Sequence, residues 1–164
     1  MAILPFYFGF SKTSFFAQIV SSELLTLLNS QRESSGLTSL KENPKLQAAA
    51  ELKAQDMFQQ DYFGHQSPDG TPAWHWVKKM GYDYKMAGEN LAIGFLESKE
   101  VHQAWNDSTL HKQNLLNPGF QDVGIAVVKG EFQSYETTVV VQLLGRPQKK
   151  ATIVPVAEAK EPAQ

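Results

Sequence analysis

Two runs of β-branched residues near the C-terminal end constrain the fold of this chain more than any other feature. Residues 123–129 and 137–144 carry apolar side chains at both odd and even positions, and a turn is expected around Gly130 between them. Because alternate side chains of a strand point to opposite faces, a sheet built from these runs is apolar on both faces. Such a sheet must be covered twice, which favours an α+β fold with helices on each side of a small antiparallel sheet.

Helical segments that can cover this sheet precede it in the chain. Apolar spacing and capping residues predict helices over residues 17–34 and 44–60, a third capped by Thr71 and a fourth capped by Ser98. A strand over residues 86–95 is predicted between the third and fourth helices. This order contains too few strand–helix–strand units for a parallel sheet, so the antiparallel arrangement is preferred.

The composition excludes several classes of protein. The chain has 164 residues, the length of one domain, and 42% of them are hydrophobic, enough for a packed core. The formal net charge of −2 lacks the basic excess that nucleic-acid binding requires, so we expect no nucleic-acid partner. Because the chain has no cysteine, disulfides, thiol nucleophiles, iron–sulfur clusters and cysteine-ligated zinc are excluded as well.

The two ends of the chain differ in composition from the predicted domain at residues 17–145. Residues 1–16 are apolar but too short to span a membrane. We interpret them as a leader or membrane-anchor remnant, or as an N-terminal arm that packs its phenylalanines on the domain. Residues 146–164 are rich in lysine, alanine, glutamate and proline, and we interpret them as a disordered tail or linker.

Two histidines and one acid are the candidates for site chemistry. His65 and His111 lie just past predicted helix ends, in loops where side chains from distant segments can converge. Glu89 shares a predicted strand face with Leu91 and Ile93, so its carboxylate must be paired or hydrogen-bonded. Burial would make Glu89 a general base or a partner that orients a histidine; a carboxylate that anchors a neighbouring loop is the other interpretation.

An ordered series of motifs resembles one protein family. In chain order the series is Asn29-Ser30-Gln31-Arg32, Asn43-Pro44-Lys45-Leu46, Ala54-Gln55-Asp56-Met57, Tyr62-Phe63-Gly64-His65, Ser67-Pro68-Asp69-Gly70, Ala87-Gly88-Glu89-Asn90-Leu91-Ala92, His111-Lys112-Gln113-Asn114 and Val123-Gly124-Ile125-Ala126. Over about residues 18–145 the chain is similar to the CAP superfamily (cysteine-rich secretory proteins, antigen 5 and pathogenesis-related 1), in its bacterial SCP-like branch. The absence of cysteine separates the chain from the disulfide-rich eukaryotic branch.

The resemblance implies a fold, a location and a site. CAP domains are α-β-α sandwiches that mostly act outside the cytoplasm; their cleft is lined by two histidines and two acids, and some hold a divalent metal there, often zinc. Carried over by motif, the histidines are His65 and His111, and one acid is Glu89. The place of the second acid is taken by Ser108, which we expect on the cleft side, whereas neighbouring Asp107 should point away.

Three functions follow from these residues. We favour a non-catalytic, extracytoplasmic domain whose cleft, lined by His65, Glu89, Ser108 and His111, binds a metal, lipid, glycan, peptide or other small molecule. The alternative is a hydrolase in which zinc on His65 and His111 activates water with Glu89 as base, although catalytic zinc normally has three protein ligands. A structural module of the cell envelope is the third. We further expect a monomer, tethered to a membrane only through sequence that is absent or degenerate at the N-terminus.

Overall fold

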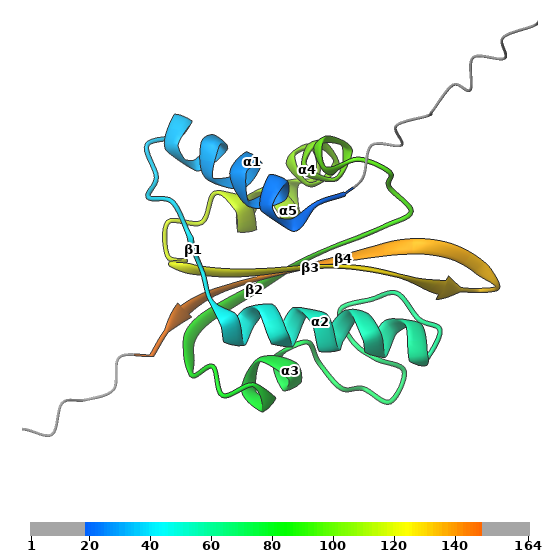
Figure 1. The fold of residues 1–164 in the computed structure, drawn as a ribbon. Coiled ribbons are helices and arrows are strands. Elements are labelled where there is room, and N and C mark those ends of the chain that lie inside the picture. Colours follow the sequence, from blue (N-terminus) through cyan, green and yellow to red (C-terminus); the bar gives the residue numbers. More distant parts are fainter. Residues whose placement is uncertain (1–18, 149–164) are drawn as a thin grey trace, which may run out of the picture.

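The chain forms three layers, with a four-stranded sheet between two layers of helices (Figure 1). This computed structural model describes residues 19–148. Its elements are, in chain order, α1 (Ser21–Ser34), β1 (Lys41–Glu42), α2 (Pro44–Gln59), α3 (Trp74–Lys79), β2 (Tyr84–Ile93), α4 (Ser98–Asp107), α5 (Thr109–Leu115), β3 (Asp122–Phe132) and β4 (Tyr135–Pro147).

The sheet has the strand order β1-β3-β4-β2. β3 and β4 form a long hairpin, and β2 pairs antiparallel with the other side of β4, which leaves β2 at one edge of the sheet. β1 has two residues and runs parallel to the start of β3 at the other edge. The predicted α+β fold, a three-layer sandwich around a small antiparallel sheet, is therefore confirmed, and β1 adds one short parallel pair to it.

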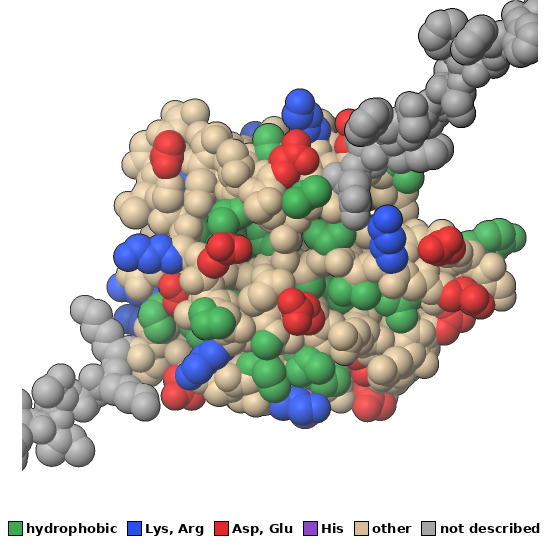
Figure 2. All heavy atoms as spheres, in the orientation of Figure 1, with side chains coloured by type: hydrophobic (Ala, Val, Ile, Leu, Met, Phe, Trp, Pro, Cys, Tyr) green, Lys and Arg blue, Asp and Glu red, His purple; other side chains and the backbone are tan. Residues whose placement is uncertain are grey.

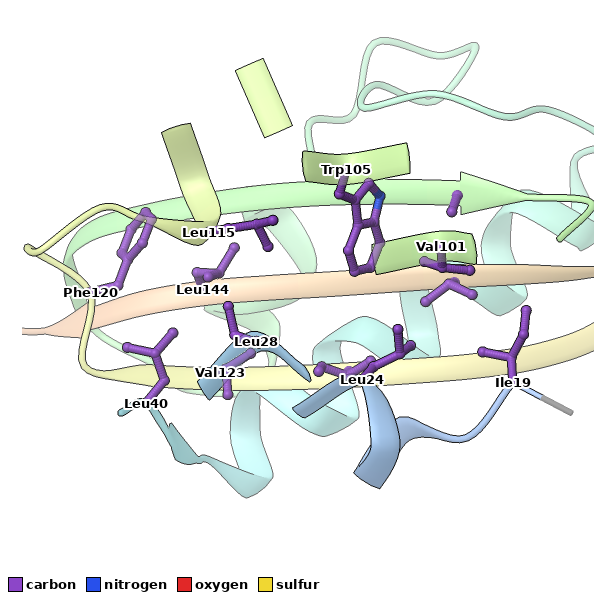
Figure 3. Close-up of a cluster of buried hydrophobic side chains, with 13 residues drawn as sticks. Ile19, Leu24, Leu28, Leu40, Val101, Trp105, Leu115, Phe120, Val123 and Leu144 are labelled. Atoms are coloured by element: carbon purple, nitrogen blue, oxygen red, sulfur yellow. The ribbon is translucent and has the colours of Figure 1, made fainter. Parts of the chain in front are cut away.

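Each face of the sheet packs against its own hydrophobic core. On one face, side chains from α1, α4 and α5 surround Trp105, which is 1% exposed (Figure 3). On the other face, α2 and α3 contribute Met57 and Val77, both fully buried. Here α2 lies so close to β3 that a Cβ atom on Gly124 would overlap the backbone of Leu46. Both faces of β3 and β4 are thus covered, as their sequences predict.

The hairpin between β3 and β4 turns later than the sequence pattern predicts. Gly130 lies within β3, opposite Thr137, and the turn is made by Gln133 and Ser134, whose φ angles are 49° and 67°. The glycine at position 130 serves packing instead, because a Cβ atom there would lie 2.8 Å from the ring of Phe58. The predicted turn at Gly130 is therefore wrong.

The last strand continues beyond the predicted domain boundary. Arg146 and Pro147 belong to β4, and the N–H of Gln148 donates to the carbonyl oxygen of Asp83 at 2.9 Å. The predicted arm at residues 1–16 and the remainder of the predicted tail lie outside the described residues. None of the helices within residues 19–148 combines the length and the hydrophobicity needed to cross a membrane.

The first and fourth helices begin differently from the prediction. Ser98 is the first residue of α4 rather than its cap, and its hydroxyl oxygen accepts a hydrogen bond of 2.9 Å from the N–H of Val20. This bond ties the start of α1 to the start of α4. The helix α1 itself begins at Ser21, four residues later than predicted, since Ile19 and Val20 are not helical.

The third helix also begins later than predicted. Pro72 pairs with Gln66 in an isolated β-bridge, so the segment around Thr71 is held extended and α3 starts only at Trp74. The bridge shapes the loop that carries His65 toward the edge of the sheet.

Candidate functional site

A short hydrogen bond joins His65 to Glu89. The distance between Nδ1 of His65 and Oε1 of Glu89 is 2.6 Å. The glutamate side chain is 2% exposed, whereas the histidine side chain is 63% exposed. The pair therefore has a fixed, buried carboxylate and an accessible imidazole, whose Nε2 remains available to a ligand. Of the two interpretations of Glu89, this geometry favours the partner that orients a histidine.

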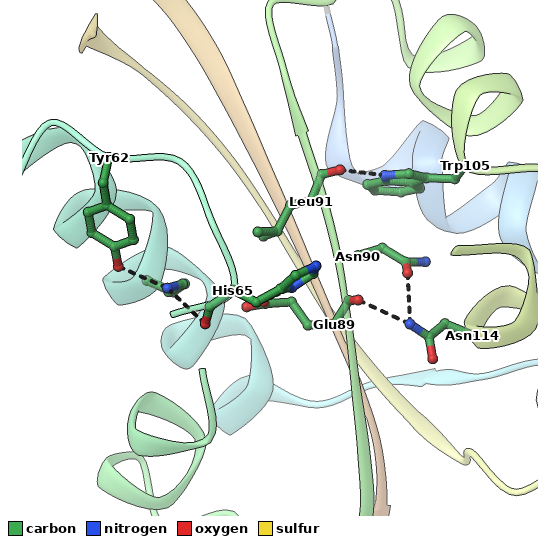
Figure 4. A network of polar contacts seen from close by, with 8 residues as sticks. Tyr62, His65, Glu89, Asn90, Leu91, Trp105 and Asn114 are labelled. Atoms are coloured by element: carbon green, nitrogen blue, oxygen red, sulfur yellow. Dashed lines mark hydrogen bonds and ion pairs between the residues drawn. The ribbon is translucent and has the colours of Figure 1, made fainter. Parts of the chain in front are cut away.

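The alternation of β2 explains why Glu89 lies here. Leu91, two residues further along the strand, is buried in the core beneath α2, and Glu89 points to the same face of the sheet. His65 reaches this face from the loop that follows α2 (Figure 4). The hydrogen bond to Glu89 raises the pKa of His65, burial partly opposes this, and the charge of Glu89 adds to the rise.

A buried lysine, which the sequence pattern does not mark as a site residue, lies behind this pair. Lys53 of α2 is fully buried and donates to the hydroxyl oxygen of Tyr62 at 2.8 Å and to the carbonyl oxygen of His65 at 3.4 Å. Tyr62 in turn donates to Asp56 at 2.6 Å. Burial lowers the pKa of Lys53, while the charges of Glu89 and Asp56 oppose that change. The available signal is a lysine within the apolar stripe of a helix, where a charge requires partners.

His111 lies in α5, and the prediction of a loop at this position is wrong. Its carbonyl oxygen accepts a hydrogen bond of 3.3 Å from the side chain of Asn90 on β2. Burial lowers the pKa of His111, and the positive charge of His65 lowers it further. That His65 and His111 share one site stays a prediction.

Ser108 joins α4 to α5 and is half-buried. Asp107 is exposed, in agreement with its predicted outward direction, and accepts a hydrogen bond from Gln103. The role of Ser108 in a cleft stays a prediction. The remaining histidines of the described chain, His75 and His102, lie on α3 and α4.

A hollow of about 350 Å³ lies beside the His65–Glu89 pair. Gln66 and Trp74 line one side, and Asn114 of α5 lines the other. Asn114 is held in place because its side-chain N–H groups donate to the carbonyl oxygen of Glu89 at 3.0 Å and to Asn90 at 2.9 Å (Figure 4). Neither Ser108 nor His111 lines this hollow. The sequence does not mark Gln66, Trp74 and Asn114 as site residues, because their roles depend on which segments the fold brings to this edge.

Charge is not concentrated on the face of the molecule in Figure 2. Hydrophobic side chains gather over the lower part of this face, around α3, and acidic and basic side chains are scattered between them. This mixture agrees with the formal net charge of −2 and offers no single-sign field to a highly charged ligand.

Imidazole nitrogens are ligands that divalent metals such as zinc accept, and the carboxylate of Glu89 orients the imidazole of His65. A carboxylate bonded to one ring nitrogen commonly fixes a histidine that binds metal through the other. Within residues 19–148, no group of three or more histidine, cysteine or acidic side chains is arranged to hold a metal ion. A cation on His65 and His111 would therefore have two protein ligands, one fewer than catalytic zinc normally has.

The fold and this site define a class of protein. The family model described as "Cysteine-rich secretory protein family" (CAP) matches residues 25–144, most of the chain. The chain therefore belongs to the CAP family, and the resemblance drawn from its motifs is confirmed. Its lack of cysteine is consistent with a bacterial SCP-like member.

Individual relatives agree with this assignment. The chain is 38% identical to "Uncharacterized protein YkwD" of Bacillus subtilis (strain 168) over 107 residues, which are 65% of this chain and 42% of YkwD. It thus spans less than half the length of that relative. An extracellular protein containing a SCP domain from Bacillus anthracis is 25% identical, with a TM-score of 0.66 over 76% of this chain and 39% of that chain. An outer surface protein from Borrelia burgdorferi shares the fold, with a TM-score of 0.68, 22% identity, and coverage of 77% of this chain and 92% of that chain.

Proposed function

We propose that this CAP domain binds a ligand in the hollow beside His65 and Glu89, without catalysing a reaction on it. The observation that carries the proposal is the 2.6 Å bond between a buried carboxylate and an exposed imidazole. Holding an accessible polar group in one orientation lowers the entropy lost when a ligand binds. The hollow beside the pair adds the aromatic ring of Trp74 and the amides of Gln66 and Asn114 as further contacts.

A divalent cation such as zinc is part of this proposal. His65, through Nε2, and His111 would hold it, and the remaining coordination positions would be left to water or to the ligand. When bound, such a cation supplies a positive centre that attracts electron-rich groups of a ligand. Glu89 fixes the ring of His65 in the orientation that exposes Nε2.

A metal-assisted hydrolase, with Glu89 as base, is supported less well. Oε1 of Glu89 is already engaged by His65, and Oε2 is buried without a hydrogen-bond partner among the described residues. A base must reach the proton that it removes. Hydrolysis of a protein or ester substrate that is lost in Glu89→Gln would contradict the proposal of binding alone.

We place this binding outside the cytoplasm. The support is family membership together with the similarity to an extracellular protein of Bacillus anthracis at 25% identity. Fractionation of the producing cells, with this chain detected by antibody in medium, envelope and cytoplasm, tests the location. Recovery in the cytoplasm alone would contradict it.

Calorimetric titration of zinc chloride into the full chain tests the site. The titration is run at pH about 7.5, because a histidine binds metal through a neutral imidazole. We expect binding by the unaltered chain, loss of binding in His65→Ala and in His111→Ala, and unchanged binding in the matched control His75→Ala. Binding that survives His65→Ala, or no binding at all, would contradict a cation at this site.

A further inference from the structure

The backbone of β2 has one side that no strand covers, because β2 lies at the edge of the sheet. The N–H of Gly94 donates to the carbonyl oxygen of Thr138 in β4 at 3.1 Å, and this bond fixes the alternation of the strand. Residues an even number of positions from Gly94 direct their backbone groups toward β4, whereas the intervening residues direct theirs away from it. Ala87, Glu89 and Leu91 therefore present their N–H and C=O groups to the open edge.

Side chains from the helices close the middle of this edge. The side chain of Asn114 donates to the carbonyl oxygen of Glu89 at 3.0 Å. The indole N–H of Trp105 donates to the carbonyl oxygen of Leu91 at 2.9 Å. Such side-chain caps remove acceptors that would otherwise pair with another chain.

The edge remains open just before these caps. Among the described residues, the N–H and C=O of Ala87 and the N–H of Glu89 have neither a strand partner nor a side-chain partner. Ala87 and Glu89 both line the hollow of about 350 Å³, between the loop that carries His65 and the side chain of Asn114. The hollow therefore has unpaired backbone groups as its floor.

We propose that this hollow takes an extended peptide segment, which pairs with β2 at Ala87 and Glu89 as an added strand. The inference rests on the proposed function, since it names the ligand class for the same hollow. A donor and an acceptor on one residue, followed by a donor two residues later, match the backbone of an extended peptide. The hollow has a volume of about 350 Å³ and is flanked by the loop of His65 and by Asn114, so we infer a single extended segment as its occupant rather than the edge of a second folded copy.

Peptide pairing fixes the hydrogen bonds, and the walls of the hollow select among side chains. Residues of an added strand alternate in direction, so every second side chain of the peptide would face the loop of His65 and Trp74. The ring of Trp74 packs against Tyr84, with centroids 6.3 Å apart, and so offers a supported apolar surface. Peptides with an apolar or aromatic residue at that position should bind more tightly than peptides with glycine there.

Amide hydrogen exchange, followed by NMR on the full chain, tests the proposal. Without peptide, the amides of Ala87 and Glu89 should exchange quickly, while those of Gly88 and Asn90, which pair with β4, should exchange slowly. The probe is a mixture of pentapeptides with an acetylated N-terminus and an amidated C-terminus. Every position carries a random choice of the amino acids other than cysteine. The mixture should slow exchange at Ala87 and Glu89 by about tenfold and leave the amide of Leu37 in the α1–β1 connection, which is already hydrogen-bonded to Arg32, unchanged.

A proline substitution gives the matched variant. Ala87→Pro removes an N–H that points away from β4, so the ladder between β2 and β4 keeps its bonds. It should abolish the protection of Glu89 by the peptides, whereas the control Ala87→Ser, which keeps the N–H, should retain it. If Ala87→Pro does not fold, the exchange of the unaltered chain with and without peptides still decides.

Each of the following outcomes would overturn the inference. Slow exchange at Ala87 without peptide would mean that the edge is already closed. Protection that depends on protein concentration alone would indicate a second copy, and equal protection by a linear tetrasaccharide of N-acetylglucosamine would indicate a glycan. If no peptide protects these amides but zinc binding still requires His65, only the peptide inference fails. If neither probe binds, the proposed function fails with it.

Discussion

The indole N–H of Trp105 donates a 2.9 Å hydrogen bond to the carbonyl oxygen of Leu91, from a side chain that is 1% exposed. The bond links α4 to the edge strand of the sheet, and the ring fills the core on that side. One side chain therefore supplies both apolar packing and a hydrogen-bond donor.

Substitutions of Trp105 should separate these two contributions. Trp105→Ala should lower the free energy of unfolding by about 3–5 kcal/mol, because it leaves a large cavity. Trp105→Phe keeps most of the apolar volume but leaves a buried carbonyl unpaired, so it should cost about 1–3 kcal/mol. Urea denaturation followed by circular dichroism measures both, with Trp74→Phe at a half-buried site as control. A loss below about 1 kcal/mol for Trp105→Ala would contradict the packing described.

Replacement of Arg32, even by lysine, should destabilise the fold. Its buried guanidinium donates to the carbonyl oxygens of Thr38, Leu115 and Asn117, at 3.0, 2.8 and 3.0 Å. A lysine ammonium cannot reproduce the planar, forked geometry of these bonds. Arg32→Lys should therefore cost about 2 kcal/mol in urea denaturation. The half-buried Arg146, replaced in the same way, is the control and should change stability little; equal losses at the two positions would refute the argument.

Gly124 should tolerate no side chain. A Cβ atom there would overlap the backbone of Leu46 and Gln47, which cannot move without displacing α2 from the sheet. Gly124→Ala should destabilise the fold by about 3 kcal/mol or more. At Gly64 the nearest atom to an added Cβ would be 3.6 Å away, so Gly64→Ala is a suitable control. Thermal unfolding of the two variants should differ clearly, and similar melting temperatures would show that α2 does not pack as described.

Zinc binding should depend on pH chiefly through His65. Its pKa is raised above the ordinary value of about 6.5 by the hydrogen bond to Glu89, so protons compete with the metal up to higher pH than for a free histidine. Burial and the charge of His65 lower the pKa of His111, which is therefore already neutral when His65 loses its proton. Affinity should rise with pH through the raised pKa of His65, with release of about one proton per zinc near neutral pH.

Calorimetry in two buffers of different ionisation enthalpy counts these protons. In Glu89→Gln the bond that raises the pKa of His65 is weakened, so the rise of zinc affinity with pH should occur at lower pH. Affinity at high pH should also fall by about 10–100-fold, because the ring is no longer oriented. Release of two protons near neutral pH, or an unchanged profile in Glu89→Gln, would contradict this assignment.

The pattern of apolar residues is enough to predict the layers and the need of Glu89 for a polar partner, but not which partner it has. Period-two alternation in β2 puts Glu89 on the face of Leu91, and burial then demands a partner whatever the rest of the fold. The elements that the pattern does not predict are fixed by hydrogen bonds between residues that are far apart in the sequence. Both residues of β1 are exposed, and its position depends on bonds such as that from the N–H of Lys41 to the carbonyl oxygen of Gln121, at 3.0 Å. Lys53 likewise has partners that only the fold brings to it.

The hollow lies where the two helical layers meet at the edge of the sheet. His65 approaches β2 from the layer of α2 and α3, and Asn114 approaches it from the layer of α4 and α5 (Figure 4). A ligand in contact with both would bind only while both layers are docked, so opening of either layer would release it. Occupancy would therefore couple the two halves of the molecule, making unfolding more cooperative and adding stability that grows with the logarithm of the ligand concentration.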